Sequence, residues 1–149
     1  MKFYIATDHA GFHYKAQIIA YLETKGAEVV DLGPQSAERV DYPDYGRKCA
    51  EAVKEDEGSF GIVVCGTGIG ISISANKVPG IRAALCHDAY TAAMARAHND
   101  AQILAFGERV VGMGVVTSMI DAFIDTEFEG GRHAGRVEKI NAIDEKYRR

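Results

Sequence analysis

The sequence predicts an α/β fold in which a parallel sheet of five strands is covered by helices on both faces. Five short apolar runs alternate with segments whose apolar residues recur every three or four positions, as strands alternate with helices. The runs are almost wholly apolar, which is typical of strands buried on both faces. In such a fold, the reactive residues are expected beyond the carboxyl ends of the strands.

In the first part of the chain, residues 3–7 and 28–32 are apolar and rich in β-branched side chains, which favours strands. Between them, the apolar spacing from residue 12 to residue 22 predicts a helix, and Gly26 ends it. Pro43 is typical of the first turn of a helix, so a second helix is expected from there toward the next acidic cluster.

The later elements follow the same alternation. Strands are predicted at residues 61–65, 81–86 and 103–106. Helices are predicted at residues 71–76, 89–97 and 112–124, the last with Val115, Met119 and Phe123 on one face. A final helix carries Val137, Ile140, Ile143 and Tyr147. Because this helix follows a complete sheet, we expect it to extend across a neighbouring subunit.

Composition indicates one compact domain spanning residues 1–149, long enough to bury a core without disulfides or metals. The net charge of −4 gives no support to nucleic-acid binding. Three cysteines without C-x-x-C spacing suit a reducing cytosol. The N-terminal apolar run is too short for a signal peptide and no segment could span a bilayer, so a cytoplasmic protein is expected.

The most informative segment is residues 61–77, in which an apolar strand leads into Cys65 and then into Gly66, Gly68 and Gly70. Glycines allow a tight turn whose N–H groups face an anion at a helix N-terminus, and this environment favours the thiolate form of a cysteine. The spacing matches neither G-x-G-x-x-G nor a Walker A loop, and Ile71 stands where a cysteine phosphatase loop needs arginine.

Two interpretations of this segment remain. In the functional one, Cys65 moves a proton while backbone N–H groups hold a developing oxyanion. In the structural one, Cys65 is a small buried residue that ends a strand.

Other candidates also follow predicted strands or end predicted helices. Asp8 and His9 come directly after the first strand, where Asp8 fits a helix cap and a ligand contact equally well. His9 and His13 lack the glutamate of H-E-x-x-H, so no metal site is expected. His98 and Asn99 fit a helix C-terminus with Asn99 left-handed, and fit an acid/base histidine beside an amide equally well.

Arg132 and Arg136 are four residues apart and share one face of the last helix. They follow a glycine pair at a helix start, an arrangement suited to phosphate. The alternative is an ordinary solvated basic face.

These segments together resemble one family along nearly the whole chain. The matching segments are Asp8-His9-Ala-Gly-Phe12, Asp41-Tyr-Pro43, the run from Cys65 to Lys77, Gly80-Ile-Arg-Ala83, His98-Asn-Asp100, Leu104-Ala-Phe-Gly107 and Glu129-Gly-Gly-Arg-His133. They are similar to the type B ribose-5-phosphate isomerases, a family that also includes galactose-6-phosphate isomerase subunits and enzymes acting on allose 6-phosphate.

The resemblance implies a Rossmann-like three-layer α/β/α sandwich that works without a metal or other cofactor as a homodimer or homotetramer. It implies interconversion of D-ribose 5-phosphate and D-ribulose 5-phosphate, a pentose phosphate pathway reaction, through a cis-enediolate. Isomerisation of a six-carbon sugar phosphate is the alternative. A non-catalytic phosphate- or nucleotide-binding module and a thiol redox protein are rivals from other classes.

The resemblance also implies a role for each site residue. Cys65 would be the base, and the amides from Gly66 through Thr67, Gly68 and Ile69 to Gly70 would hold the enediolate. His98 would open the sugar ring with Thr67 nearby. Sugar or phosphate contacts would come from Asp8, His9, Tyr42 and Asn99, and phosphate contacts from Arg109, Arg132 and Arg136. A second branch uses glutamate at the position of Ile69, so this chain fits the cysteine branch. His98, Asn99 and some arginines would reach the site from the partner subunit.

Overall fold

The computed structural model describes residues 1–148 and has the predicted α/β architecture. All five strands are parallel and lie in the order β2-β1-β3-β5-β4. Their bounds are β1 Lys2–Thr7, β2 Glu28–Asp31, β3 Phe60–Cys65, β4 Ala83–Leu85 and β5 Ile103–Gly107. The prediction of a five-stranded parallel sheet is therefore confirmed.

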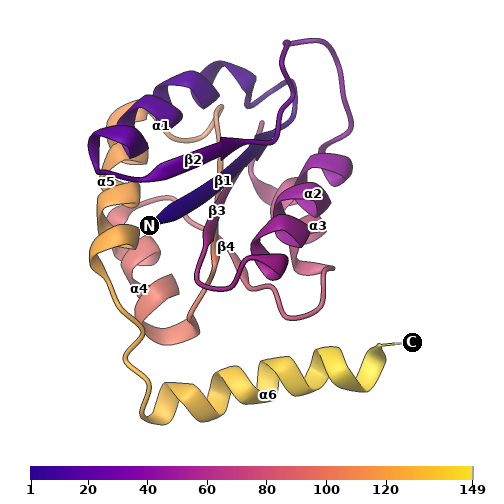
Figure 1. Cartoon of the computed structure of the whole chain (residues 1–149), viewed down its shortest axis with the longest axis vertical. Coiled ribbons are helices and arrows are strands. Elements are labelled where there is room, and N and C mark those ends of the chain that lie inside the picture. Colours follow the sequence, from indigo (N-terminus) through magenta and orange to yellow (C-terminus); the bar gives the residue numbers. More distant parts are fainter. Residues whose placement is uncertain (149) are drawn as a thin grey trace.

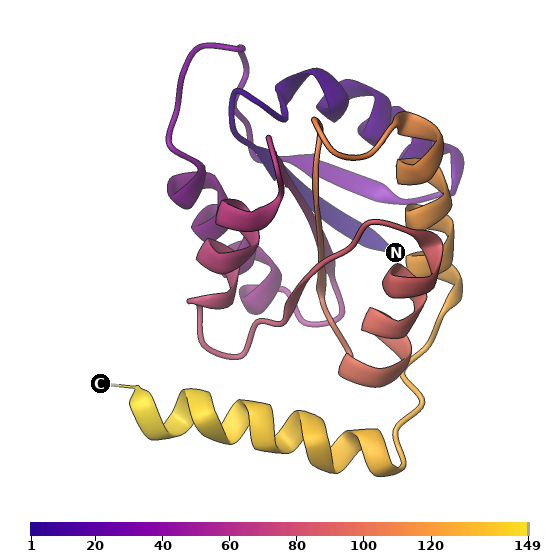
Figure 2. The ribbon, with the colours of Figure 1, turned by 180° about the vertical axis from the view of Figure 1, so that it is seen from behind.

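Helices cover both faces of this sheet and give the three layers (Figure 1). The helices are α1 Phe12–Thr24, α2 Tyr42–Glu55, α3 Ile69–Asn76, α4 Ala89–Asn99, α5 Met113–Asp125 and α6 Arg132–Tyr147. Helices α1, α4 and α5 lie on one face, while α2 and α3 lie on the other, as the reverse view in Figure 2 also shows. None of the helices within residues 1–148 is long and apolar enough to cross a membrane.

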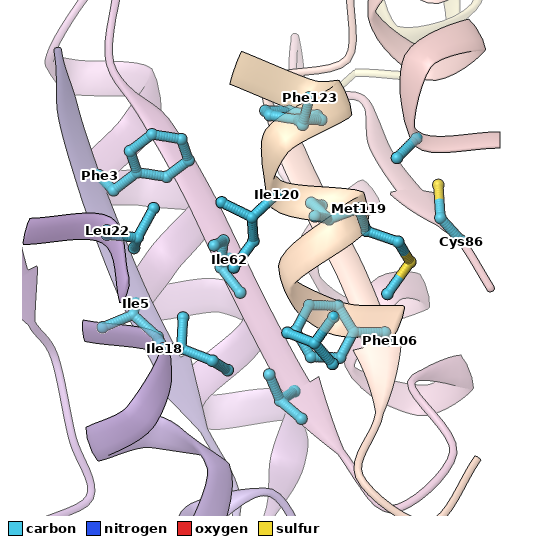
Figure 3. Packing of buried hydrophobic residues seen from close by; sticks show 14 of the residues in the cluster. Phe3, Ile5, Ile18, Leu22, Ile62, Cys86, Phe106, Met119, Ile120 and Phe123 are labelled. Carbon is cyan, nitrogen blue, oxygen red and sulfur yellow. The ribbon is translucent and has the colours of Figure 1, made fainter. Parts of the chain in front are cut away.

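Each face of the sheet carries its own apolar core. On the α1–α4–α5 side, strand residues such as Phe3 and Ile62 pack against Leu22 of α1 and Phe123 of α5 (Figure 3). On the other side, Cys49, Ala50 and Val53 of α2 and Ile71 and Ala75 of α3 pack on the sheet. Burial of β1, β3 and β5 on both faces explains their continuous apolar sequences.

The fourth strand is shorter than the sequence predicts, because only Ala83–Leu85 pairs with β5. Residues before it are held in a turn in which the amide of Ile81 donates to the carbonyl of Val78. β4 is an edge strand, and the side chain of Asn76 pairs with the backbone of Ala83 on that edge. Asn76 Nδ2 donates to the Ala83 carbonyl over 2.9 Å, and the Ala83 amide donates to Asn76 Oδ1 over 2.8 Å.

Helix α5 buries a slightly different face from the predicted one. Met119 and Phe123 are buried as expected, but Val116 takes the place expected for Val115, which is 38% exposed. Val116, Met119, Ile120 and Phe123 lie three or four residues apart and form one continuous stripe.

Helix α6 lies apart from the sheet, beneath the end at which the strands begin (Figures 1 and 2). Its first turns bury His133 and Val137, whereas Ile143 is 61% and Tyr147 72% exposed. Asp144 Oδ2 accepts from the Gly80 amide over 2.8 Å, and Asn141 Oδ1 accepts from Arg82 Nη1 over 3.0 Å. The helix is therefore anchored at its start and along one polar side, and much of its apolar surface remains uncovered in the chain.

Candidate active site

Strand register brings the segments that follow β1, β3 and β5 together at the carboxyl end of the sheet. Thr7 lies beside Val64 in the β1–β3 pair, and Cys65 lies beside Gly107 in the β3–β5 pair. The residues that follow these strands therefore surround a common cleft of about 470 Å³. Its lining residues are Asp8, His9, Ala10, Tyr42, Cys65, Gly66, Thr67, Ile69, Gly70, Ile73 and Arg109.

Cys65 lies at the end of β3 against the N-terminus of α3 and is only 4% exposed. Its Sγ atom accepts a hydrogen bond from the Gly68 amide over 3.1 Å. Gly68 adopts a left-handed φ of 80°, and a Cβ there would lie 2.6 Å from the backbone carbon of Phe106. Only glycine fits this close turn, which aims an N–H group at the sulfur.

Two of the loop amides expected to hold an anion already have acceptors inside the loop. The Gly68 amide donates to Cys65, and the Ile69 amide donates to Thr67 Oγ1 over 3.2 Å. The expected anion hole therefore narrows to the amides of Gly66, Thr67 and Gly70. Thr67 and Ile69 both have exposed side chains beside the cleft.

Asp8 and His9 line the same cleft and are held by contacts with the backbone. Asp8 Oδ1 accepts from the amides of Ala10 over 2.9 Å and of Gly11 over 3.1 Å, so this carboxylate orders the turn before α1. His9 Nδ1 lies 3.1 Å from the carbonyl oxygen and 3.3 Å from the amide nitrogen of Val40. These contacts fix the imidazole and leave Nε2 as the nitrogen that can contact a ligand.

Tyr42 and Arg109 approach the glycine loop from two other elements. The Tyr42 ring packs so closely on Gly70 that a Cβ there would lie 2.4 Å from a ring carbon. Arg109 Nη1 lies 3.2 Å from the Cβ position of Gly66, and the Arg109 amide donates to the Gly66 carbonyl over 3.1 Å. The loop therefore has a phenol on one side and a guanidinium on the other, a combination suited to a hydroxylated anion.

The remaining predicted residues lie at the other end of the sheet. His98 and Asn99 occupy the last turn of α4, and Arg132 and Arg136 the first turns of α6. Helix α4 runs back from β4 to the start of β5, so its last turn is separated from Cys65 by the length of β5. A strand of five residues is roughly 16 Å long. Within one chain, these four residues and Cys65 therefore belong to two separate groups.

The end of α4 differs from the expected cap. Asp100, not Asn99, takes the left-handed conformation, with a φ of 46°. The Asp100 carboxylate accepts from Arg96 Nη1 over 2.9 Å, and the Asn99 carbonyl accepts from Arg82 Nε over the same distance. These bonds place the helix end firmly and leave the His98 ring on the surface toward α6.

His98 lies beside Glu129 and His133, to which the sequence analysis gives no role although both lie in a matching segment. Its ring stacks on that of His133 at 4.1 Å between centroids, and Glu129 faces both rings. Burial, together with the positive charges of His98 and Arg132, lowers the pKa of His133 below its ordinary value. Glu129 and His133 have a four-residue spacing that could have drawn attention, but His98 joins them only through the packing of α4 against α6.

A larger groove of about 810 Å³ lies elsewhere, where α2 and α3 meet. Its lining includes Arg47, Glu51, Lys77 and Pro79, and among the described residues that line it there is no cysteine or histidine. The smaller cleft at the strand ends holds the thiol, the imidazole and the glycine loop, so we place the candidate active site there.

Comparisons with known proteins agree with one family throughout. The sequence model described as Ribose/Galactose Isomerase matches residues 3–140. The Escherichia coli protein named Ribose-5-phosphate isomerase B is 48% identical over 97% of each chain. A Clostridium thermocellum structure of Ribose-5-Phosphate Isomerase B is 55% identical, with a TM-score of 0.97 and coverage of 99% of this chain and 100% of that one.

A third relative was solved with a sugar phosphate in place. The Mycoplasma genitalium Ribose-5-phosphate Isomerase B with bound Ribulose-5-phosphate is 41% identical, with a TM-score of 0.93 and coverage of 99% of this chain and 97% of that one. The sequence model, the sequence relatives and the solved structures thus all indicate the same family over nearly the entire chain. The chain belongs to the ribose/galactose isomerase family, and its similarity within that family is to the type B ribose-5-phosphate isomerases.

Proposed function

We propose that this chain, as a single isomerase domain, interconverts D-ribose 5-phosphate and D-ribulose 5-phosphate with Cys65 as the base. The observation that carries the mechanism is the Cys65 thiol at the start of α3, with the Gly68 amide donating to its sulfur. Its relatives, named and solved as type B ribose-5-phosphate isomerases, support the choice of substrate.

The proposed reaction begins after His98 has helped to open the sugar ring, with Thr67 nearby. The Cys65 thiolate removes the proton from C2, and the electron pair of that bond forms a double bond between C1 and C2. The carbonyl oxygen at C1 becomes an oxyanion, which the amides of Gly66, Thr67 and Gly70 would stabilise. The C2 hydroxyl proton then passes to that oxygen, and the Cys65 thiol returns its proton to C1, which leaves the ketose.

The substrate needs polar partners in addition to the base. Asp8, His9 and Tyr42 line the same cleft and are suited to the sugar hydroxyls. Arg109 brings a guanidinium to the glycine loop, where it would hold phosphate. Nothing in this scheme requires a metal, because the proton and the charge are handled by the thiol and the amides.

A second copy of the chain would complete the site. Four of the expected site residues lie at the end of the strands opposite Cys65, namely His98, Asn99, Arg132 and Arg136. Helix α6 also leaves Ile143 and Tyr147 uncovered. A two-fold dimer pairs one surface with the same surface of its copy. In the proposed dimer, the α4–α6 end of one chain reaches the Cys65 cleft of the other, in both directions.

The reaction is tested by following ribulose 5-phosphate formation from ribose 5-phosphate with purified protein and a metal chelator. In D₂O, the wild type should exchange the C2 proton, whereas Cys65→Ser should lose nearly all turnover and keep its unfolding temperature. Near-full turnover in Cys65→Ser would refute the base assignment. If only six-carbon aldose phosphates are turned over, the substrate is a six-carbon sugar phosphate and not ribose 5-phosphate. If no sugar phosphate exchanges its C2 proton, the chain is a phosphate-binding protein and not an isomerase.

Shared sites are tested by mixing two inactive variants, Cys65→Ser and His98→Gln. Random re-assortment makes half of the dimers mixed, and each mixed dimer has one intact site, so about a quarter of wild-type activity should return. Sites built from one chain would recover none. Light scattering on the same samples gives the number of chains per particle.

A cytoplasmic location is part of the proposal. Cys49, Cys65 and Cys86 are all free and buried. Free thiols, one of them in the proposed active site, suit a reducing compartment.

A further inference from the structure

The cluster of His98, Glu129 and His133 has the composition of a transition-metal site. One nitrogen of each imidazole and one oxygen of the carboxylate lie within 4.8 Å of one another. His98 Nε2 is 4.0 Å from Glu129 Oε2, and His133 Nε2 is 3.5 Å from Glu129 Oε1. Two histidines and one glutamate, with a further position open, are a common ligand set for Zn²⁺.

The second observation is an unsatisfied nitrogen inside this cluster. His133 is only 5% exposed, and its Nε2 has no hydrogen-bond partner within residues 1–148. A buried polar atom without a partner costs free energy, so its presence calls for a group that occupies that position. Nε2 faces Glu129, and a cation between the two would satisfy both.

To hold an ion, the rings must leave their present stack, because nearly parallel imidazoles cannot direct both Nε2 lone pairs at one position. The His98 side chain is 38% exposed and has room to turn. Zn²⁺ binds imidazole nitrogen and carboxylate oxygen at about 2.0–2.2 Å, which places neighbouring ligand atoms roughly 3.3 Å apart. Glu129 lies between α5 and α6 and is 54% exposed, so its side chain can rotate toward the rings.

We propose that His98, Glu129 and His133 form a binding site for a divalent transition cation of the Zn²⁺ class. The ion would sit at the α4–α6 junction, with water completing its coordination. Within one chain, this site shares no residue with the thiol cleft around Cys65, which lies at the opposite end of the strands.

The expected consequence is inhibition, and this part rests on the proposed function. A nitrogen bound to Zn²⁺ cannot move a proton, so an occupied site would remove His98 from ring opening. The chain would then act as a metal-free isomerase that rising free zinc turns off reversibly.

Binding is measured on the full chain, stripped with chelator and titrated calorimetrically with ZnCl₂ alone. CoCl₂ then serves as a spectroscopic probe, since four-coordinate cobalt with these ligands absorbs visible light. The expected result is one ion per chain. Glu129→Gln and His133→Gln should each weaken Zn²⁺ binding by at least about tenfold. Loss of a residue that only hydrogen-bonds to a ligand already costs about that much, and these two residues are proposed as ligands themselves.

Three further variants separate this site from other zinc ligands. Glu127→Gln and His13→Gln remove exposed residues of the same types outside the cluster and should bind Zn²⁺ as the wild type does. Cys65→Ser removes the competing thiol and should also bind as the wild type does. Unchanged binding in Glu129→Gln, an exposed position where folding is not at risk, would overturn the proposal, and so would loss of the single site in Cys65→Ser.

Isomerase assays distinguish the two proposals. Zinc should inhibit wild-type turnover of ribose 5-phosphate, and chelator should restore it. Cluster-dependent zinc binding by a chain that isomerises no sugar phosphate would refute the proposed function and keep the metal site. Turnover by a chain without cluster-dependent binding would refute the metal site alone.

Discussion

The amide of Gly68 donates a hydrogen bond to the sulfur of Cys65 over 3.1 Å, three residues along the chain. This contact joins the strand end to the helix start, because Gly68 is the residue that precedes α3. The turn that makes the contact depends on a left-handed glycine pressed against the backbone of Phe106. Gly68 therefore both makes the turn possible and donates the hydrogen bond to the sulfur.

We expect Gly68→Ala to destabilise the fold and to remove activity. The left-handed φ and the 2.6 Å approach to Phe106 add together, for a loss of roughly 3 kcal/mol or more. Gly58→Ala is the matched control, since Gly58 has a φ of 87° with open space around it, and it should lose only about 1–2 kcal/mol. Urea unfolding of both variants gives the comparison, and equal losses would show that the contact with Phe106 is unimportant.

The Arg136→Ala variant should weaken substrate binding more than catalysis. Phosphate is held in the ground state and the transition state alike, so KM should rise about tenfold or more while kcat changes less than about threefold. Lys139→Ala, on the same helix and also exposed, serves as the control and should leave both constants unchanged. Steady-state kinetics with ribose 5-phosphate decide the matter, and a fall in kcat at constant KM would contradict the assigned role.

His133 makes stability depend on pH on the acid side. Its pKa is lowered in the folded state, whereas an unfolded histidine titrates near 6.5. Below about pH 6.5 the unfolded chain therefore binds more protons, so the free energy of unfolding falls as the pH drops toward the folded-state pKa. Well above pH 6.5, His133 is neutral in both states and contributes no pH dependence to the free energy of unfolding.

The His133→Gln variant should not show this fall in the free energy of unfolding at acid pH. Its stability deficit relative to the wild type should shrink between pH 7.5 and pH 5, as measured by urea midpoints at several pH values. His13→Gln removes an exposed histidine and should follow the wild type in parallel. A constant difference for His133→Gln across the range would show that burial does not disfavour its charged form.

The side chain of Asn76 closes the open edge of the sheet at Ala83. Asn76→Ala removes both hydrogen bonds and should cost about 1–2 kcal/mol, with a greater tendency to aggregate through β4. Asn76→Asp keeps an acceptor for the Ala83 amide and loses the donor, so about half of that loss is expected. Urea unfolding and light scattering test both effects. Wild-type stability in Asn76→Ala would mean that water replaces the side chain without cost.

Much of this architecture could be predicted from sequence because its physical signals are local. The parallel sheet is predicted by strands such as 61–65, whose apolar residues are continuous. Cys65 is predicted as a site residue because it is the last residue of that strand. The extent of β4 could not be predicted, because it depends on where β5 offers a partner. Val115 and Val116 are adjacent apolar residues, and only the packing of α5 determines which of them is buried.

The site was predictable in its parts but not in its arrangement. Asp8, His9 and the glycine loop follow the ends of strands, so the rule for strand ends finds them. Tyr42 begins α2 and was expected only from the family resemblance. The cluster of His98, Glu129 and His133 was missed because it joins two helices that are more than thirty residues apart along the chain. The engagement of the Gly68 and Ile69 amides within the loop depends on backbone angles that residue types alone do not determine.

The distance between Cys65 and His98 within one chain has a genetic consequence under the proposed dimer. A chain defective at only one of these residues still completes one working site with a normal partner. A chain defective at both residues spoils the two sites of every dimer that it enters. Expressed beside the normal protein, Cys65→Ser should therefore behave as an ordinary recessive change, whereas the double substitution should be dominant-negative.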